Sequence, residues 1–147
     1  GASARDGIPR PEFFHYKWRA TEKNLRALVD SPAARDCCDG YLLKYRNPLT
    51  GGPTMTTIQC AVQLLPPKDE TQAHRHTSTV IYHAFRGKGV TEIGDRRFEW
   101  EQGDSFVVPL WHPHRHVNRS STEDAILFSM SDAPMLEALD LYREEIC

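Results

Sequence analysis

The sequence predicts an all-β protein: a small antiparallel β-barrel of the jelly-roll type, with a short N-terminal helix and a C-terminal helix. Three observations favour this fold class. Short runs of β-branched and aromatic residues follow one another closely, Gly and Pro turns separate them, and no helices alternate with them as in a parallel sheet. The interior or mouth of such a barrel is where a small ligand binds.

Composition indicates one globular domain with a sizeable core. The chain has 147 residues, of which 39% are hydrophobic and 26% charged. We expect an N-terminal arm and short helix over residues 1–40, and a single barrel with its C-terminal helix over residues 41–147.

Charge and hydropathy exclude two classes of partner. The 18 basic and 20 acidic residues are well mixed, so no basic stripe indicates nucleic-acid binding. No run of 18 apolar residues indicates a membrane span, and the four cysteines form no C-x-x-C pair. We therefore expect a cytoplasmic protein with reduced thiols.

The N-terminal arm is rich in aromatic side chains, namely Phe13, Phe14, Tyr16 and Trp18. Aromatic residues at this density pack onto something, either the domain itself or a neighbouring subunit. We expect a homo-oligomer, a dimer or larger, with the arm crossing to the partner.

The first half of the chain predicts one helix and two strands. Thr21 can cap a helix over residues 22–29, which Pro32 ends. Residues 41–46 and 56–65 are expected to be strands, and the second of these alternates between an apolar and a more polar face.

The second half predicts a series of strands and a closing helix. Gly94-Asp95 is a two-residue turn typical of a hairpin. A helix is expected over residues 134–145. The expected strands are residues 74–85, 90–93, 96–100, 105–108, 115–118 and 125–131.

Two histidine clusters lie in this half of the chain, at residues 74–76 and 112–116. Residues two apart on a strand point to the same face, so His74 and His76 project together. His114 is the candidate for a third imidazole from a distant strand. Three neutral imidazoles on one side of a divalent metal leave its other side open for water, substrate or oxygen.

Four further residues are candidates for the chemistry around such a metal. His116 lies two residues past His114 and therefore faces the same cavity, where it is expected to hydrogen-bond a substrate oxygen or to shuttle a proton. Gln72 and Tyr82 share the parity of the ligands, and Trp111 is expected at the barrel mouth. These three are the candidate substrate-binding residues.

The spacing of these residues resembles the two sequence motifs of the cupin superfamily. The first motif is a glycine, an H-x-H pair, a glutamate and a later glycine, and the second ends in a histidine and an asparagine. Two positions depart from the pattern, because Val80 stands in place of the glutamate and Trp111 in place of a glycine. The matching residues are His74, His76, Gly87, Gly103, Pro109, His114 and Asn118.

The order Pro-x-Trp-x-x-His-x-His resembles the gentisate 1,2-dioxygenase group, with its salicylate and 1-hydroxy-2-naphthoate relatives. That resemblance implies an Fe(II)-dependent enzyme that uses O2 to cleave the ring of a hydroxylated aromatic acid. It also implies the C-terminal half of a two-barrel protein. Zinc, nickel and copper suit the same imidazoles. Two alternatives stay open: a metal-binding or assembly domain without turnover, and a metal-dependent isomerase or storage cupin.

Overall fold

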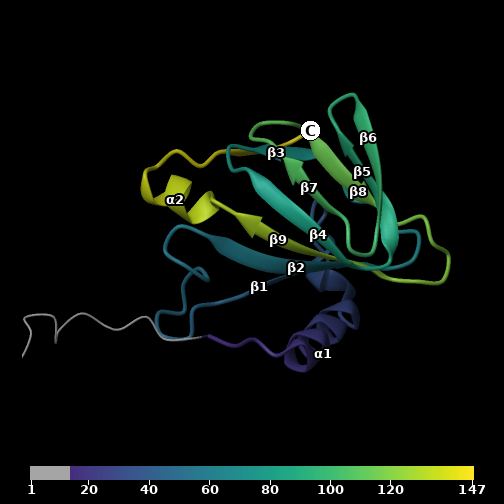
Figure 1. Ribbon diagram of the computed structural model, residues 1–147, viewed down its shortest axis with the longest axis horizontal. Helices are drawn as coiled ribbons and strands as arrows, with labels where there is room; N and C mark the ends of the chain where they lie inside the picture. Colours follow the sequence, from purple (N-terminus) through teal and green to yellow (C-terminus); the bar gives the residue numbers. More distant parts are fainter. Residues whose placement is uncertain (1–13) are drawn as a thin grey trace, which may run out of the picture.

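The computed structural model describes residues 14–147, which fold mainly into antiparallel strands (Figure 1). The all-β class is confirmed. No described helix is long and apolar enough to cross a membrane. The described elements are α1 (Trp18–Val29), the 3-10 turn η1 (Pro32–Ala34), β1 (Tyr41–Lys44), β2 (Gln59–Leu65), β3 (His74–His76), β4 (Val80–Arg86), β5 (Lys88–Ile93), β6 (Arg96–Glu101), β7 (Ser105–Val108), β8 (His114–Val117), β9 (Ala125–Ser131), α2 (Ala133–Ala138) and β10 (Glu144–Ile146).

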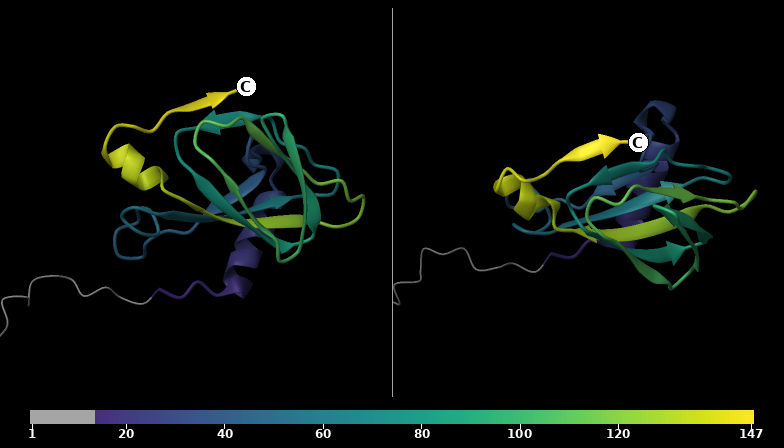
Figure 2. Two further views of the ribbon diagram at one scale, coloured as in Figure 1. Left: turned by 45° about the horizontal axis from the view of Figure 1, so that its top comes forward. Right: turned by 90° about the horizontal axis from the view of Figure 1, so that it is seen from above.

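The strands form two five-stranded sheets (Figure 2). One has the order β1-β2-β9-β4-β7, and the other has the order β10-β3-β8-β5-β6. Neighbouring strands in each sheet are antiparallel. The predicted strand over residues 74–85 is divided into β3 and β4, which belong to different sheets. The histidine pair therefore sits on one sheet while the following strand belongs to the other.

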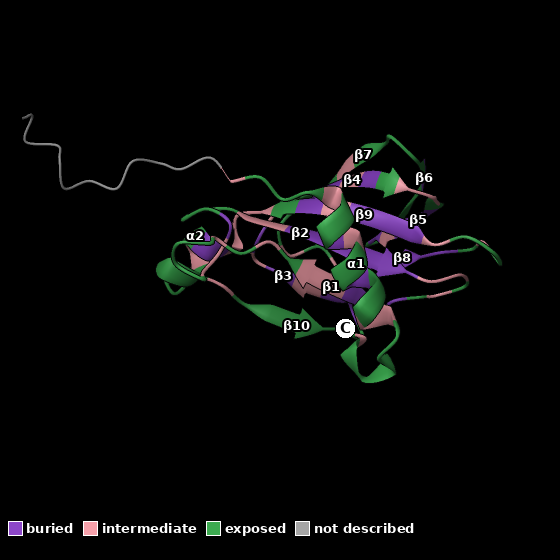
Figure 3. Ribbon diagram, turned by 90° about the horizontal axis from the view of Figure 1, so that it is seen from below, coloured by how far each residue is buried: buried purple, intermediate pink, exposed green. Residues whose placement is uncertain are grey.

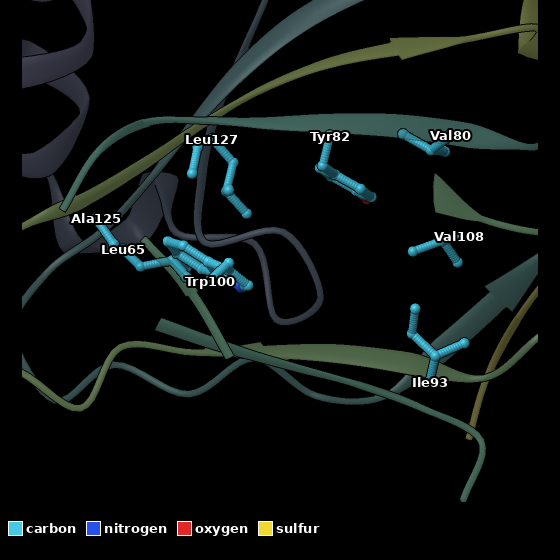
Figure 4. Packing of buried hydrophobic residues seen from close by; sticks show 9 residues of the cluster. Leu65, Val80, Tyr82, Ile93, Trp100, Val108, Ala125 and Leu127 are labelled. Carbon is cyan, nitrogen blue, oxygen red and sulfur yellow. The ribbon is translucent and has the colours of Figure 1, made fainter. Parts of the chain in front are cut away.

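The main core lies between these two sheets, where side chains from β4 and β9 meet side chains from β5 and β6 (Figure 4). Strand β4 shows the alternation that produces it. Val80, Tyr82 and Ala84 are buried, whereas Ile81 and Phe85, which point to the other face, are exposed. Burying each large apolar side chain stabilises the fold by about 1.5–3 kcal/mol.

Helix α1 lies against β1 and β2 and begins earlier than predicted (Figure 1). Leu25 on its inner side is 1% exposed and packs into a second apolar cluster. The helix starts at Trp18, whose ring lies 4.4 Å from the ring of Phe85. Thr21 is thus inside the helix and buried, and its prediction as the cap is wrong. Packing of the tryptophan favours an additional helical turn that local capping signals do not reveal.

The described part of the aromatic arm packs onto its own domain. The ring of Tyr16 lies 4.9 Å from that of Tyr45, and its hydroxyl donates to the Arg46 carbonyl at 2.6 Å. Of the two expected contacts, these residues make the one with the domain itself. Phe13 lies outside the described residues.

The prediction of a closing helix over residues 134–145 is wrong in extent. Helix α2 ends at Ala138, Asp140 takes a φ of 57°, and the chain then runs as β10 along the edge of β3 (Figure 2). All three residues of β10 are exposed (Figure 3), so no apolar alternation marks them as a strand. Backbone pairing with β3 provides the hydrogen bonds that a longer helix would have made internally.

The β5–β6 hairpin is confirmed, with Ile93 paired to Arg96 across the Gly94-Asp95 turn. Within it, Gly89 faces Trp100. A Cβ atom on Gly89 would lie 2.5 Å from the Trp100 ring and 2.6 Å from the Val117 carbonyl oxygen. Glycine at this position therefore allows the indole to lie across β5.

We predict that Gly89→Ala lowers the free energy of unfolding by about 1–3 kcal/mol, because the new methyl group overpacks the core against backbone as well as the indole. Urea unfolding measures this. Gly52→Ala is the control, since its Cβ would meet only the Thr50 side chain, at 3.3 Å, and its effect should stay within about 0.5 kcal/mol. Equal losses in the two variants would contradict the packing argument.

Candidate metal centre

Three histidines converge at the junction of β3 and β8, as the sequence predicts. His74 and His76 project from the same face of β3, and His74 is directly opposite His114 in the β3–β8 pair. One ring nitrogen of each lies within 4.8 Å of the others. The side chains are 2%, 7% and 1% exposed, in the order given by the sequence. Three buried imidazoles at this separation fit a single metal ion.

The outer nitrogens of two of these rings are held by backbone carbonyls. His76 Nδ1 lies 2.9 Å from the carbonyl oxygen of Ser78, and His114 Nδ1 lies 2.9 Å from that of His112. A carbonyl only accepts, so each Nδ1–H donates, in His76 also towards the Ser78 hydroxyl oxygen at 2.9 Å, and each Nε2 keeps its lone pair. This is the tautomer that a metal ligand bonded through Nε2 needs.

The third ring lies between two carboxylates. His74 Nδ1 is 3.1 Å from Glu144 Oε1 of β10, and its Nε2 is 3.9 Å from Asp39 Oδ1. The Nε2 atoms of His74 and His114 are buried, with no hydrogen-bond partner among residues 14–147. Buried polar atoms without partners are uncommon in native structures, and a bound metal would satisfy both.

Burial keeps the ligand set neutral. Desolvation, with the nearby charges of His74 and His76, lowers the pKa of His114 to about 3. Desolvation also lowers the pKa of His76. Neutral imidazole is the form that binds a metal, so the site favours that form near pH 7.

Asp39 and Glu144 are site residues that the sequence analysis missed. Burial raises the pKa of the Asp39 carboxyl to about 6, while His74 acts in the opposite direction. Asp39 comes from the turn before β1, which closes through paired backbone hydrogen bonds between Asp36 and Gly40. Glu144 falls within the segment that was expected to be helical. Neither has a local signal, because chain-distant segments bring both to β3.

His116 lies inside the barrel beside the three ligand candidates. It is 0% exposed, its Nδ1 is 2.7 Å from Thr91 Oγ1, and its ring centroid lies 5.9 Å from that of His114. Burial holds the pKa of His116 well below its usual range. Its Nε2 has no hydrogen-bond partner in the described part of the chain. The position agrees with the strand parity, and its catalytic role stays a prediction.

The three candidate substrate-binding residues occupy different surroundings. Tyr82 is buried in the core, with its ring centroid 4.8 Å from that of His116. Gln72 is exposed just before β3. Trp111 takes a φ of 60°, and its ring lies 4.6 Å from the guanidinium of Arg75, which leaves β3 on the face opposite the histidine pair. Tyr82 alone adjoins His116, and substrate contact by all three stays a prediction.

Two facing antiparallel sheets, with an H-x-H pair on one strand and a third histidine on its neighbour, define a cupin barrel with a three-histidine site. The cupin domain family matches residues 61–131. The chain belongs to the cupin superfamily, as its two motifs indicate.

Within that superfamily, the chain is similar to aromatic-acid dioxygenases. It is 42% identical over 137 residues to the 5-aminosalicylate 1,2-dioxygenase of Comamonas sp., covering 93% of this chain and 36% of that protein. It is 37% identical over 138 residues to gentisate 1,2-dioxygenase 1 of Aquipseudomonas alcaligenes, covering 94% of this chain and 38% of that protein.

A solved structure is similar over the same region. It is a salicylate 1,2-dioxygenase variant from Pseudoaminobacter salicylatoxidans in complex with gentisate, with a TM-score of 0.80 and 30% sequence identity. The match covers 89% of this chain and 36% of that one. The chain thus spans little more than a third of the length of these relatives.

We predict that Glu144→Gln weakens metal affinity by roughly tenfold, because a charged partner on Nδ1 makes a ligand histidine more basic. The half-exposed position of the carboxylate places the effect at the lower end of the usual range. Competition with a chelator for Zn²⁺ measures the affinity. Glu145→Gln is the matched control: it lies one residue away on β10 and pairs with Arg75 instead. The same loss in both variants would show that β10, not its carboxylate, is what matters.

Proposed function

We propose that this chain carries the Fe(II) site of a ring-cleaving dioxygenase that acts on a hydroxylated aromatic acid of the gentisate or salicylate type. The observation that carries the proposal is the buried set of His74, His76 and His114, with Nε2 lone pairs left free by contacts at Nδ1. The names of its relatives supply the substrate class and the use of O2.

The absence of a carboxylate from this converging set supports an anionic substrate. Neutral imidazoles leave the charge of a divalent ion in place, so a carboxylate and an ionised ortho hydroxyl on one ring neutralise it by chelation. Val80, where the cupin motif has glutamate, packs in the apolar core instead. Fe(II), when bound, supplies the electrons needed for reaction with O2.

The protein's own residues would position the substrate. His116 is buried on the same strand face as His114, so its free Nε2 can contact an oxygen of a chelated acid. Tyr82 packs against His116 and lines the same interior. Water is largely excluded there, which strengthens hydrogen bonds and charge interactions with the substrate.

A metal-binding or assembly domain without turnover is less well supported. All three ligand candidates are present, buried and held in the tautomer for metal binding, and the matching relatives are named for ring cleavage. Zinc, nickel or copper would suit the same donors. Elemental analysis after anaerobic loading with Fe(II) identifies which metal the chain retains.

The two neighbouring histidines of β8 provide the decisive test. His114→Ala should remove most of the bound metal, because two imidazoles make an incomplete site. His116→Ala should keep metal near the wild-type content and lower oxygen consumption with gentisate by roughly 10²–10⁴-fold, as for a lost acid–base or hydrogen-bonding group.

Metal content and oxygen uptake are measured on both variants in parallel. Loss of metal from the His116 variant alone would shift the ligand assignment by two residues. Retention of metal by both variants would refute the three-histidine site, and a wild-type protein that holds Fe(II) but consumes no oxygen with any tested aromatic acid would refute the enzyme.

Assembly into a dimer or larger oligomer is a further expectation. Val107, Ile81 and Met130 lie opposite one another on three neighbouring strands, and all three are exposed. An apolar row of this kind favours contact with another copy. Light scattering measures the mass in solution, and a monomer at high concentration contradicts the expectation.

A further inference from the structure

A chain of buried polar groups leads from β6 to His116. Trp100 Nε1 lies 2.9 Å from Thr91 Oγ1, and Thr91 Oγ1 lies 2.7 Å from His116 Nδ1. The three residues are 4%, 0% and 0% exposed, respectively. Their strands are neighbours in one sheet, and Thr91 is directly opposite both Phe98 of β6 and His116 of β8. Water is therefore excluded from this chain of contacts.

The number of hydrogens available fixes which group donates and which accepts in each of these two hydrogen bonds. An indole N–H only donates, so the Thr91 oxygen accepts from Trp100. The hydroxyl hydrogen of Thr91 then needs an acceptor of its own. Among residues 14–147, the one other group in contact with this hydroxyl is His116 Nδ1. If Nδ1 carried the hydrogen instead, a fully buried hydroxyl would lack an acceptor, which native structures avoid.

The imidazole of His116 therefore accepts at Nδ1 and carries its hydrogen on Nε2. This is the reverse of the neighbouring ligand His114, whose Nδ1 donates to the His112 carbonyl at 2.9 Å. The two rings lie two residues apart on one strand and differ in what their outer nitrogens meet. The inferred tautomer agrees with the position of His116 outside the converging set of His74, His76 and His114, because a metal ligand bonded through Nε2 needs a lone pair there.

We propose that Thr91 and Trp100 are positioning residues that hold His116 as a fixed Nε2–H donor to an oxygen of the bound aromatic acid. The substrate contact rests on the proposed function, whereas the tautomer rests on the hydrogen bonds alone. A fixed donor recognises an acceptor such as a carboxylate or phenolate oxygen, and it costs no reorganisation when charge develops on that oxygen. His116 thus acts by donating a hydrogen bond and does not act as a base.

The tautomer is measured directly by long-range ¹H–¹⁵N correlation spectra of the full chain labelled with [¹⁵N]histidine, metal-free and loaded with diamagnetic Zn²⁺. We expect hydrogen on Nε2 of His116 and on Nδ1 of His114, which serves as an internal comparison. Hydrogen on Nδ1 of His116 in the wild-type protein would overturn the proposal without any variant.

Two substitutions test the hydrogen bonds that run from Trp100 through Thr91 to His116. Thr91→Val removes the hydroxyl with little change of shape, and His116 should then no longer be held in the Nε2–H form. Thr91→Ser keeps the hydroxyl and should retain the wild-type tautomer. An unchanged tautomer in a folded Thr91→Val protein would overturn the role of Thr91. Should that variant not fold, the wild-type and Thr91→Ser spectra still test the proposal, because a hydrogen on Nδ1 of His116 in either protein would overturn it.

Gentisate binding to the anaerobic Fe(II)-loaded chain tests the contact with substrate. The dissociation constant should rise roughly tenfold in Thr91→Val, as for the loss of one oriented hydrogen bond, and stay within about twofold in Thr91→Ser. Equal affinity in all three proteins would overturn the substrate contact and leave the proposed function intact. No binding of gentisate or of salicylate by any of them, with the Nε2–H tautomer in place, would overturn the proposed function and leave the inferred tautomer of His116 intact.

Discussion

The pairing of β3 with β8 is the constraint on which the metal centre depends. The structure pairs the two strands at one position, His74 opposite His114, and β10 pairs along the outer edge of β3. Side chains alternate on a strand, so a slip of one residue would bring Arg75 or Arg115 into the interior in place of the imidazoles. Both arginines are held on the opposite face by ion pairs, with Glu145 and Glu92 respectively, which stabilise the correct register.

Once that register is set, the partner of each outer nitrogen determines what each histidine can do. A carbonyl or a carboxylate on Nδ1 makes Nε2 a lone-pair donor for metal, whereas a hydroxyl that already accepts from an indole makes Nε2 a hydrogen-bond donor. The partners of His74, His114 and His116 come from β10, the loop before β8, and β5. Identical side chains thus acquire different chemistry from segments that are separate in the sequence.

The difference between local patterns and long-range contacts also explains what could be predicted from the sequence. Runs of apolar and β-branched residues bounded by turns are local, so they located β7 and β9, and period-two alternation aligned His74 with His76. Long-range pairing is not local: the exposed residues of β10 have no strand pattern, and its apolar neighbours at helical spacing favoured a longer helix. Asp39, Glu144 and Thr91 were missed for the same reason, because each contacts a histidine through sheet pairing or a turn that sequence spacing does not encode.

The replacement of a motif glutamate by Val80 shows how the core and the site are linked. Val80 pairs with Val108 and packs in the apolar cluster that includes Tyr82, whose ring in turn contacts His116. A carboxylate at position 80 would need a charged partner, but the cluster around Val80 consists of hydrophobic side chains. Valine at this position therefore keeps the interior dry. In such an interior the charge of a metal ion held by neutral imidazoles would be weakly screened, which supports the anionic ligand of the proposed function.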